Sequence, residues 1–551
     1  MRIIRQLIIN PSGNGLGSTR TSHPLLLELS LILWKLGLLK RRMKISYRRS
    51  LPLIFLIMGS FYFQALFICK ENPFIKIQIE MNKAKIYYYD IGDYLSREDK
   101  LRIIREFGSV ERIPWTILQP NEHGDWINHR NEMFKGFIPL GDKENKKLND
   151  NDIHTFFMPY YSNGLKTQRD SWCYNSSLTV VKEKAKEQID FYNEQLGKIN
   201  RGEITEVDYG TDKISWTRAV LADIGRRKKY DIQDCEFKES LYRPFFKQNL
   251  LYYRPLNEMM YQIPKLFPTY EHKNLVICVS GVGVTKDFSC IITDTLPDLE
   301  LIGKSQCFPL YWYEEEKKIY TTGGMGDLFE EESEANYIQR DGITNWILRT
   351  ARKQHGYKIM KEDIFYYVYG LLHSPDYRTT FATDLKKSLP RLPLVENVDD
   401  FWAFSKAGRA LADLHLKYET IEPYGKCLVL HAPLTNKGDN VNYRVEKMRF
   451  GKIDSKTADK SIIHYNHAIT LEGIPAEAYE YVINGKSAIE WIMERYAVTT
   501  DKKSGITNDP NDWAREHNDE KYILNLLLRV INVSVQTVEI VKGLPKLKFD
   551  E

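Results

Sequence analysis

Residues 366–378 read YYVYGLLHSPDYR, and this stretch decides how the chain around it is interpreted. Ser374 offers a hydroxyl that can cap a helix, and the proline that follows it suits the first helical position. Beyond that proline, Tyr377, Phe381 and Leu385 recur at a spacing that lines one face of a helix. The stretch therefore predicts a helix that begins after Ser374.

Toward the C-terminus, the chain predicts more helices. Asp400 is a candidate cap for a helix with apolar residues at helical spacing, and Ser487 with Glu490 forms a capping box. The last helix is expected over about 519–541. Among these helices lie two β-type runs, at 443–450 and 462–465.

Toward the N-terminus, short β-branched or aromatic runs separated by Gly, Pro, Asn and Asp predict strands. They cover residues 250–253, 275–280, 289–293 and 306–313. An acidic, glycine-containing segment at 321–334 is the best linker candidate. We therefore expect a multi-domain fold of mixed α/β and α+β class, in which a β-rich central module precedes a helix-rich region.

The segment before this module predicts alternating elements. Residues 84–89 form a short β-type run, and residues 96–107 carry apolar side chains at helical spacing. Residues 178–200 predict a charged helix with few apolar positions, which we expect to face solvent.

Composition limits the class of protein. A chain of 551 residues is too long for one core, so two or three domains are expected. Its 43% hydrophobic and 27% charged residues are typical of a folded soluble protein. The seven cysteines form no C-x-x-C pair or Cys/His cluster, which argues against a zinc site and favours the reducing cytoplasm.

The net charge of +5 is unevenly distributed. Residues 1–50 hold ten Lys or Arg and one Asp or Glu, a surplus of +9, so the remaining 501 residues carry −4. The body of the chain is slightly acidic, and any basic surface for nucleic acid must therefore be local.

An apolar stretch at 51–69 follows a basic run and is long enough to span a bilayer. Its positive flank would hold the N-terminus inside and move the cysteine-bearing body outside, which conflicts with the cysteine pattern. We favour a buried element, or an N-terminus that is not native to the fold, and we do not expect membrane association.

Catalytic motifs are missing. No Asn/Asp-Pro-Pro-aromatic motif of an exocyclic-amine methyltransferase occurs. Residues 281–286 (GVGVTK) have the wrong glycine spacing for a phosphate loop. Asp298 and Glu300 with Lys304 depart from the usual spacing of a metal-dependent nuclease. Catalytic and metal-binding residues are therefore predicted to be absent.

Arginines and lysines near aromatic residues are the candidate DNA contacts, because guanidinium groups suit phosphates and base edges. The motifs YRPF at 242–245 and YYRP at 252–255 pair the two residue types. The candidates fall into an early group and a late group: Lys166, Arg169, Arg243, Lys247 and Arg254, then Arg378, Lys386, Lys387 and Arg391.

Several segments together resemble a known family. Residues 86–95 (IYYYDIGDYL), 120–128 (PNEHGDWIN) and 161–170 (YSNGLKTQRD) are similar to the end of the methyltransferase region in type ISP restriction-modification enzymes. The family's C-terminal target-recognition domain is resembled by YRPF, by FPLY at 308–311, by residues 366–378 and by DLHL at 413–416. The similarity covers roughly residues 83–545.

The resemblance implies three parts of the chain. Residues 1–80 are an atypical start, residues 83–235 the end of a methyltransferase-like domain, and residues 236–551 a target-recognition domain. The sequence departs from the family before residue 83, where the cofactor-binding glycines and the catalytic motif would lie. A truncated gene or a shifted reading frame before residue 80 would explain that departure.

The resemblance also implies a function. A complete member methylates adenine N6 and cleaves DNA with S-adenosylmethionine, ATP and Mg²⁺, but this chain alone is expected to bind none of the three. We expect it to recognise double-stranded DNA in the cytoplasm, with the methyltransferase, helicase and nuclease supplied by another chain encoded upstream. The alternative is a membrane-anchored or protein-interaction module that uses residues 51–69.

Overall fold

The computed structural model divides the chain into two compact units, residues 1–129 (unit 1) and 130–551 (unit 2). The predicted apolar segment at 51–69 and the predicted linker at 321–334 lie outside the described residues. The structure describes residues 9–10, 85–92, 95–316, 336–431, 442–455 and 457–549.

Unit 1 contains an antiparallel sheet and one long helix. The sheet has the order β1-β2-β3, with strands Ile9–Asn10, Lys85–Tyr88 and Thr116–Leu118. Helix α3 (Arg97–Phe107) begins after Ser96, whose hydroxyl accepts a hydrogen bond from the amide of Asp99 at 3.1 Å. The predictions of a strand at 84–89 and a helix at 96–107 are confirmed.

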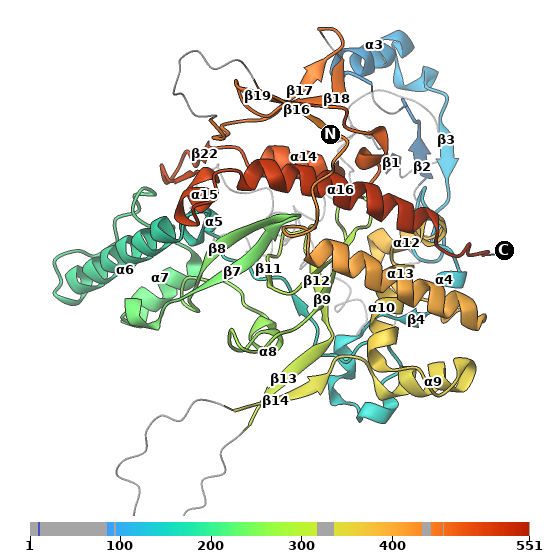
Figure 1. The fold of residues 1–551 in the computed structure, drawn as a ribbon, viewed down its shortest axis with the longest axis horizontal. Coiled ribbons are helices and arrows are strands. Elements are labelled where there is room, and N and C mark those ends of the chain that lie inside the picture. Colours follow the sequence, from blue (N-terminus) through green and yellow to red (C-terminus); the bar gives the residue numbers. More distant parts are fainter. Residues whose placement is uncertain are drawn as a thin grey trace, which may run out of the picture. The chain divides into compact units, whose positions relative to one another are not determined.

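Two four-stranded sheets form the β-rich part of unit 2 (Figure 1). The first has the order β10-β9-β12-β5, with strands Cys290–Thr293, Val276–Val279, Gln306–Pro309 and Ser162–Asn163. The second has the order β11-β7-β8-β6, with strands Leu296–Pro297, Glu236–Arg243, Phe246–Tyr252 and Tyr174–Asn175. The predicted β-rich central module is confirmed.

A hairpin extends from this module. Strands β13 (Tyr311–Glu315) and β14 (Tyr337–Asp341) pair antiparallel, and the predicted linker lies between them in the sequence. A small sheet pairs β4 (Ile138–Pro139) with β15 (Arg391–Leu392). Short helical segments complete this part: α4 (Met133–Gly136), η2 (Lys143–Lys147), η3 (Asp150–Asp152), α5 (Asp170–Cys173), η4 (Ile232–Asp234) and α8 (Ile263–Leu266).

Helices α9 (Asn345–His355), α10 (Lys361–Leu371) and α13 (Val398–Leu416) follow the hairpin. Where α10 crosses α13, a Cβ atom on Gly370 would lie 2.2 Å from the carbonyl oxygen of Phe404. A Cβ atom on Gly408 would lie 1.9 Å from the carbonyl oxygen of Tyr366. The glycine in the YYVYG motif therefore permits backbone contact between these two helices.

The helix predicted after Ser374 is interrupted. Ser374 caps α11 (Pro375–Thr380), but the chain breaks at Phe381, with φ −105° and ψ 23°, before α12 (Ala382–Lys387). The break leaves the predicted apolar face intact, since Tyr377, Phe381 and Leu385 are all buried. The α13 cap is Asn397, whose side chain accepts from the Asp399 amide at 2.8 Å, so the prediction of Asp400 as cap is wrong.

Helix α6 (Leu178–Asn200) corrects another prediction. It buries Val181, Ala185, Ile189, Tyr192 and Leu196 at helical spacing, so it has an apolar face and does not lie wholly in solvent. The Tyr192 ring stacks on Tyr230 with centroids 3.8 Å apart, beside α7 (Arg218–Gly225). Because α6 also carries many charged residues, its apolar face was not predicted from the sequence.

The C-terminal part contains a four-stranded antiparallel sheet and three helices. The sheet order is β16-β19-β18-β17, with strands Leu428–His431, Ile469–Glu472, Ala458–His464 and Arg449–Lys452. The helices are α14 (Ala488–Arg495), α15 (Asn511–Glu516) and α16 (Tyr522–Lys542). Four short strands and a 3-10 turn complete it: β20 (Val482–Ile483), β21 (Lys486–Ser487), β22 (Thr499–Thr500), β23 (Thr507–Asn508) and η5 (Ala476–Tyr479).

Two sequence predictions in this part are confirmed. Ser487 and Glu490 form the capping box of α14, with the Glu490 amide donating to the Ser487 hydroxyl at 3.2 Å. The predicted last helix is α16, which is long and apolar enough to cross a membrane by length and composition alone. Within the described residues, 56% of its apolar window is buried inside the protein, as is typical of a core helix.

Two apolar clusters form the core of unit 2. One combines residues of α6, β7, β8, α14 and α16, and therefore draws on both sides of the predicted domain boundary at 235/236. The other combines β9, β10, α10, α11 and α13. The division into a methyltransferase-like part and a recognition part stays a prediction.

Candidate nucleic-acid interface

Arg243, from the YRPF motif, is engaged inside the protein. Its Nη1 donates to the buried carboxylate of Asp298 at 2.6 Å, and its guanidinium lies 3.8 Å from the centre of the Tyr242 ring. Burial raises the pKa of Asp298 to about 7, and the positive charge of Arg243 opposes that shift. The charge of Arg243 is therefore already balanced within the fold.

Arg169 and Lys247 also have internal partners. The Arg169 side chain is fully buried and donates to the Thr217 hydroxyl at 2.8 Å. The Lys247 amine lies 2.7 Å from Glu419 and 3.1 Å from Glu239, and although burial lowers its pKa, the two carboxylates raise it to a value above the ordinary one. Both cations are therefore held by contacts within the protein.

Lys166 and Arg254 form no ion pair with any residue that the structure describes. Lys166 is half-buried, and its backbone pairs with Met259 through hydrogen bonds of 2.9 and 3.0 Å. Arg254 is exposed and donates to the carbonyl of Asn257 at 3.2 Å. Arg254 lies within the segment 254–259, and Lys166 pairs with the same segment through Met259, whose side chain is also exposed.

Two members of the late group contact the segment that leads into β10. Nε of Arg378 donates to the carbonyl of Leu372 at 2.6 Å, and its Nη2 lies 3.2 Å from the Cys290 sulfur. The amine of Lys386 forms an ion pair with Asp287 at 2.8 Å. Arg378 and Lys386 therefore both contact residues 287–290.

The other two members of the late group are Arg391 and Lys387. Arg391 donates to the carbonyls of Lys135 and Phe137 at 2.7 and 3.0 Å and so secures the β4–β15 sheet. Lys387 is half-buried at the end of α12. Arg254 is exposed, whereas Lys166, Lys386 and Lys387 are half-buried, and contact of these four residues with DNA stays a prediction.

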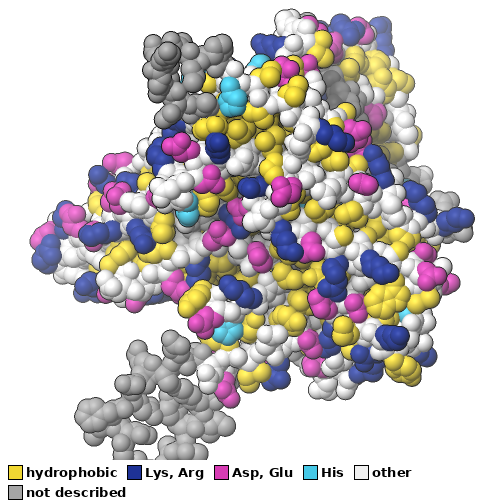
Figure 2. Space-filling view, viewed as in Figure 1, with side chains coloured by type: hydrophobic (Ala, Val, Ile, Leu, Met, Phe, Trp, Pro, Cys, Tyr) yellow, Lys and Arg dark blue, Asp and Glu magenta, His cyan; other side chains and the backbone are white. Residues whose placement is uncertain are grey.

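The surface does not present one dominant basic face in the view of Figure 2. Lys and Arg side chains are interspersed with Asp and Glu over the described residues of this face. This distribution agrees with the charge of −4 for the chain beyond residue 50. Any DNA-binding surface must therefore depend on local groups of cations.

One such local group of cations was not predicted from the sequence. We call it the basic cleft: a concave site of about 450 Å³, lined by Asn442, Arg444, Glu446, Lys447, Arg449, His464, Asn466 and His467. The cations at 444, 447 and 449 were present in a run interpreted only as a strand. The sequence did not indicate the cleft because the histidines that line it, His464 and His467, come from a separate strand and turn.

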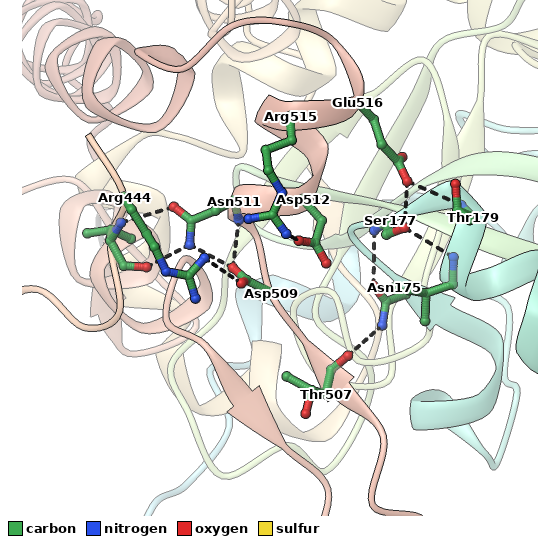
Figure 3. A network of polar contacts seen from close by, with 12 residues as sticks. Asn175, Ser177, Thr179, Arg444, Thr507, Asp509, Asn511, Asp512, Arg515 and Glu516 are labelled. Atoms are coloured by element: carbon green, nitrogen blue, oxygen red, sulfur yellow. Dashed lines mark hydrogen bonds and ion pairs between the residues drawn. The ribbon is translucent and has the colours of Figure 1, made fainter. Parts of the chain in front are cut away.

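A polar network connects the start of α6 with the C-terminal part of unit 2 (Figure 3). Glu516 of α15 accepts hydrogen bonds from the Ser177 hydroxyl at 2.6 Å and from the Leu178 amide at 2.9 Å. Burial raises the pKa of Glu516, but these hydrogen bonds outweigh it, so the pKa lies below the ordinary value. A carboxylate thus caps the positive end of a 23-residue helix.

A second part of the network holds the neighbouring hairpin. The Asn175 amide donates to the carbonyl of Thr507 at 3.0 Å, and the Ser176 backbone amide donates to Asn508 at 2.8 Å. The segments joined here are separated by 332 residues. The end of the resembled methyltransferase region and the C-terminal part are therefore joined by directional hydrogen bonds.

The segment that resembles a phosphate loop is the connection of a β-hairpin. Strands β9 and β10, on either side of residues 280–289, pair antiparallel, and no helix follows the glycines. A Cβ atom on Gly281 would lie 2.3 Å from the Lys304 carbonyl oxygen, so this glycine permits close backbone contact. Lys304 in turn donates to the carbonyl of Val282 at 3.4 Å. These contacts are those of a turn.

Comparison with known families identifies the class of this module. The family model described as the Type ISP C-terminal specificity domain matches residues 156–526. This range includes the central sheets, the α10–α13 pair and the basic cleft. The chain belongs to the Type ISP family, which confirms the resemblance drawn from the sequence. No curated protein shows a significant match to the chain.

Three solved structures are similar over most of the chain. The DNA-bound Type ISP enzyme LlaBIII has 37% identity and a TM-score of 0.70, and the match covers 85% of this chain and 28% of that one. A nuclease-deletion mutant of LlaGI with a DNA substrate mimic has 35% identity, a TM-score of 0.69 and coverages of 85% and 40%. The DrdV–DNA complex has 30% identity, a TM-score of 0.68 and coverages of 84% and 44%. This chain therefore spans less than half the length of each relative.

Proposed function

We propose that this chain binds double-stranded DNA and supplies target recognition to a Type ISP restriction-modification system. The observation that carries the proposal is the specificity-domain match over residues 156–526. Structural similarity to enzymes solved with DNA or a DNA mimic supports it. The accessible cations described above are local charges that can hold a phosphate backbone.

We further propose that the chain does not catalyse methyl transfer or ATP hydrolysis by itself. The missing methyltransferase motif and the hairpin role of residues 281–286 support this. S-adenosylmethionine, ATP and Mg²⁺ would then be bound by a second polypeptide, encoded upstream, that carries the methyltransferase, helicase and nuclease. Both chains would act in the cytoplasm, where the DNA is.

A selection experiment tests the recognition function. The full chain is incubated with a labelled library of duplexes that carry a randomised centre, and bound DNA is sequenced after several rounds. We expect one motif to be enriched, and its duplex to bind about 10³-fold or more tightly than a scrambled duplex at physiological salt. Equal affinity for both duplexes would contradict sequence-specific recognition.

A methylation assay tests the division of labour. The chain is incubated with the enriched duplex and methyl-labelled S-adenosylmethionine, with boiled protein as the control. We expect no incorporation from the chain alone and incorporation after the upstream polypeptide is added. Labelled DNA above the boiled control in the first reaction would show that the chain is itself a methyltransferase.

A further inference from the structure

The basic cleft presents cations whose charges are not balanced within the fold. Lys447 and Arg449 are exposed, and neither forms an ion pair or a side-chain hydrogen bond with any residue that the structure describes. Across the strand pair β17–β18, Arg449 stands directly opposite His464. Glu446 is the one acidic residue in the lining. The cleft thus has an excess of positive charge.

The loop that leads to these cations is fixed by the side chain of Asn466. Its amide nitrogen donates to the carbonyls of Asn442 and Arg444 at 2.8 and 2.9 Å. Its amide oxygen accepts from the backbone of Ala468 and Ile469, both at 2.8 Å. One asparagine therefore joins the 442–444 loop to the turn between β18 and β19.

Asn511 also fixes this loop, at the residue that follows Arg444 (Figure 3). Its side chain accepts from the Val445 amide at 3.0 Å and donates to the Val445 carbonyl at 2.7 Å. Arg444 forms an ion pair with Asp509 at 2.7 Å, which is part of the same network. Val445 and Met448 are buried in the core, while Lys447 between them and Arg449 after them are exposed.

From this arrangement we propose that the basic cleft holds the sugar-phosphate backbone of DNA, with Lys447 and Arg449 each neutralising a phosphate. This inference rests on the proposed DNA-binding function. A concave site with two unbalanced cations matches the charge of a phosphate backbone. Since backbone phosphates are the same in every sequence, the cleft positions the duplex and leaves target selection to other residues.

The fixed loop matters for affinity. Long cationic side chains lose conformational freedom when they bind, but a backbone already held by Asn466 and Asn511 adds no further ordering cost. The cleft therefore acts as a preorganised anchor. Arg444 contributes less to it, because its charge is shared with Asp509.

The test uses the full chain and a fluorescent duplex in an anisotropy titration at several salt concentrations. The double variant Lys447→Ala/Arg449→Ala is expected to bind every duplex about 10- to 100-fold more weakly at ~0.1 M salt. The slope of log affinity against log salt should fall by about two units, one for each lost phosphate contact. The cognate-to-scrambled ratio should stay unchanged.

A matched control removes the same charges elsewhere. Arg218 begins α7 and Lys229 follows it; both are exposed and form no ion pair with a described residue. The variant Arg218→Ala/Lys229→Ala should keep the parental affinity and slope. An equal loss in both double variants would assign the effect to net charge and overturn the cleft proposal.

A conservative variant separates phosphate contact from base reading. Arg449→Lys keeps a positive charge but loses the planar fork that reads guanine, so the salt slope should be retained. Loss confined to one base position would show that Arg449 reads sequence, contrary to the proposal. Thermal unfolding of each variant excludes misfolding as the cause.

Two failures are distinguishable. If the unmodified chain binds no duplex, the proposed DNA-binding function is wrong and the cleft proposal falls with it. If the unmodified chain binds DNA and the cleft double variant has the same affinity and slope, the cleft proposal alone is wrong.

Discussion

Arg243 and Lys247 of the early group and the two unpaired cations of the basic cleft are the same residue types in opposite circumstances. In the early group, Arg243 lies against Asp298 and Lys247 lies between two carboxylates, so their charges are used within the fold. In the cleft, Lys447 and Arg449 have no ion-pair partner among the described residues. A cation therefore indicates a nucleic-acid contact only when the fold has not already neutralised it.

Mutations in the two groups should change different quantities, the free energy of unfolding for one and the affinity for DNA for the other. Removing Arg243 leaves the buried Asp298 carboxylate without its ion-pair partner, and removing Lys247 leaves Glu239 and Glu419 without theirs, so either change should lower the free energy of unfolding. Removing a cation from the cleft leaves the fold unchanged but lowers the affinity for DNA. Each of the following substitutions tests whether a residue stabilises the fold or contacts DNA.

The largest effect is expected for Arg243→Ala. Its side chain is 12% exposed, and its loss leaves the buried Asp298 carboxylate unpaired, which should cost about 3–5 kcal/mol in the free energy of unfolding. Urea denaturation measures this change, with Arg243→Lys as a control that keeps the charge and should lose less. A variant of full stability that no longer binds DNA would move Arg243 into the interface.

Arg254→Ala comes next and concerns specificity. Arg254 is exposed, so if it reads a guanine edge its loss should cost about 1–3 kcal/mol at one base position. Binding to a set of duplexes with single base changes measures this, and stability should not change. A uniform loss across all duplexes would instead make Arg254 a phosphate contact.

Lys247→Met should have a smaller effect on stability. Methionine keeps the apolar stem but removes the amine from between Glu419 and Glu239, which should cost about 1–3 kcal/mol, toward the lower end because the lysine is 19% exposed. Thermal unfolding of the variant beside Lys247→Arg measures it. Unaltered stability together with weaker DNA binding would reverse its assignment.

The smallest effect is expected for Lys386→Ala/Lys387→Ala. A phosphate contact by both residues would flatten the salt slope by about one unit each. Because Lys386 already pairs with Asp287, we expect a change nearer one unit than two, equal for cognate and scrambled duplexes. An unchanged slope would remove α12 from the interface.

The elements most accurately predicted were those with a local chemical signal. The capping box at Ser487 and the cap at Ser374 depend on residues within one helical turn, and both occur in the structure. The break at Phe381 was missed because helical spacing continues across it, and all three apolar side chains remain buried. The α13 start was displaced by three residues, since Asn397 caps as well as Asp400 would.

The site was harder to predict than the fold. Whether Arg169 is accessible depends on Thr217 and Glu258, which are far from it in the sequence. The basic cleft combines a loop, a strand and a turn that become neighbours only when β17 pairs with β18. Composition reports how many cations a chain has, but pairing partners decide which of them remain available.

The carboxylate of Glu516 has a consequence for exchanging parts between relatives. A hybrid gene that joined residues near 175–180 from one enzyme to a C-terminal part from another would separate the α6 start from its cap. The same crossover would separate Asn175 and Ser176 from the 507–508 hairpin. Recombination that preserves these contacts should therefore carry both segments together.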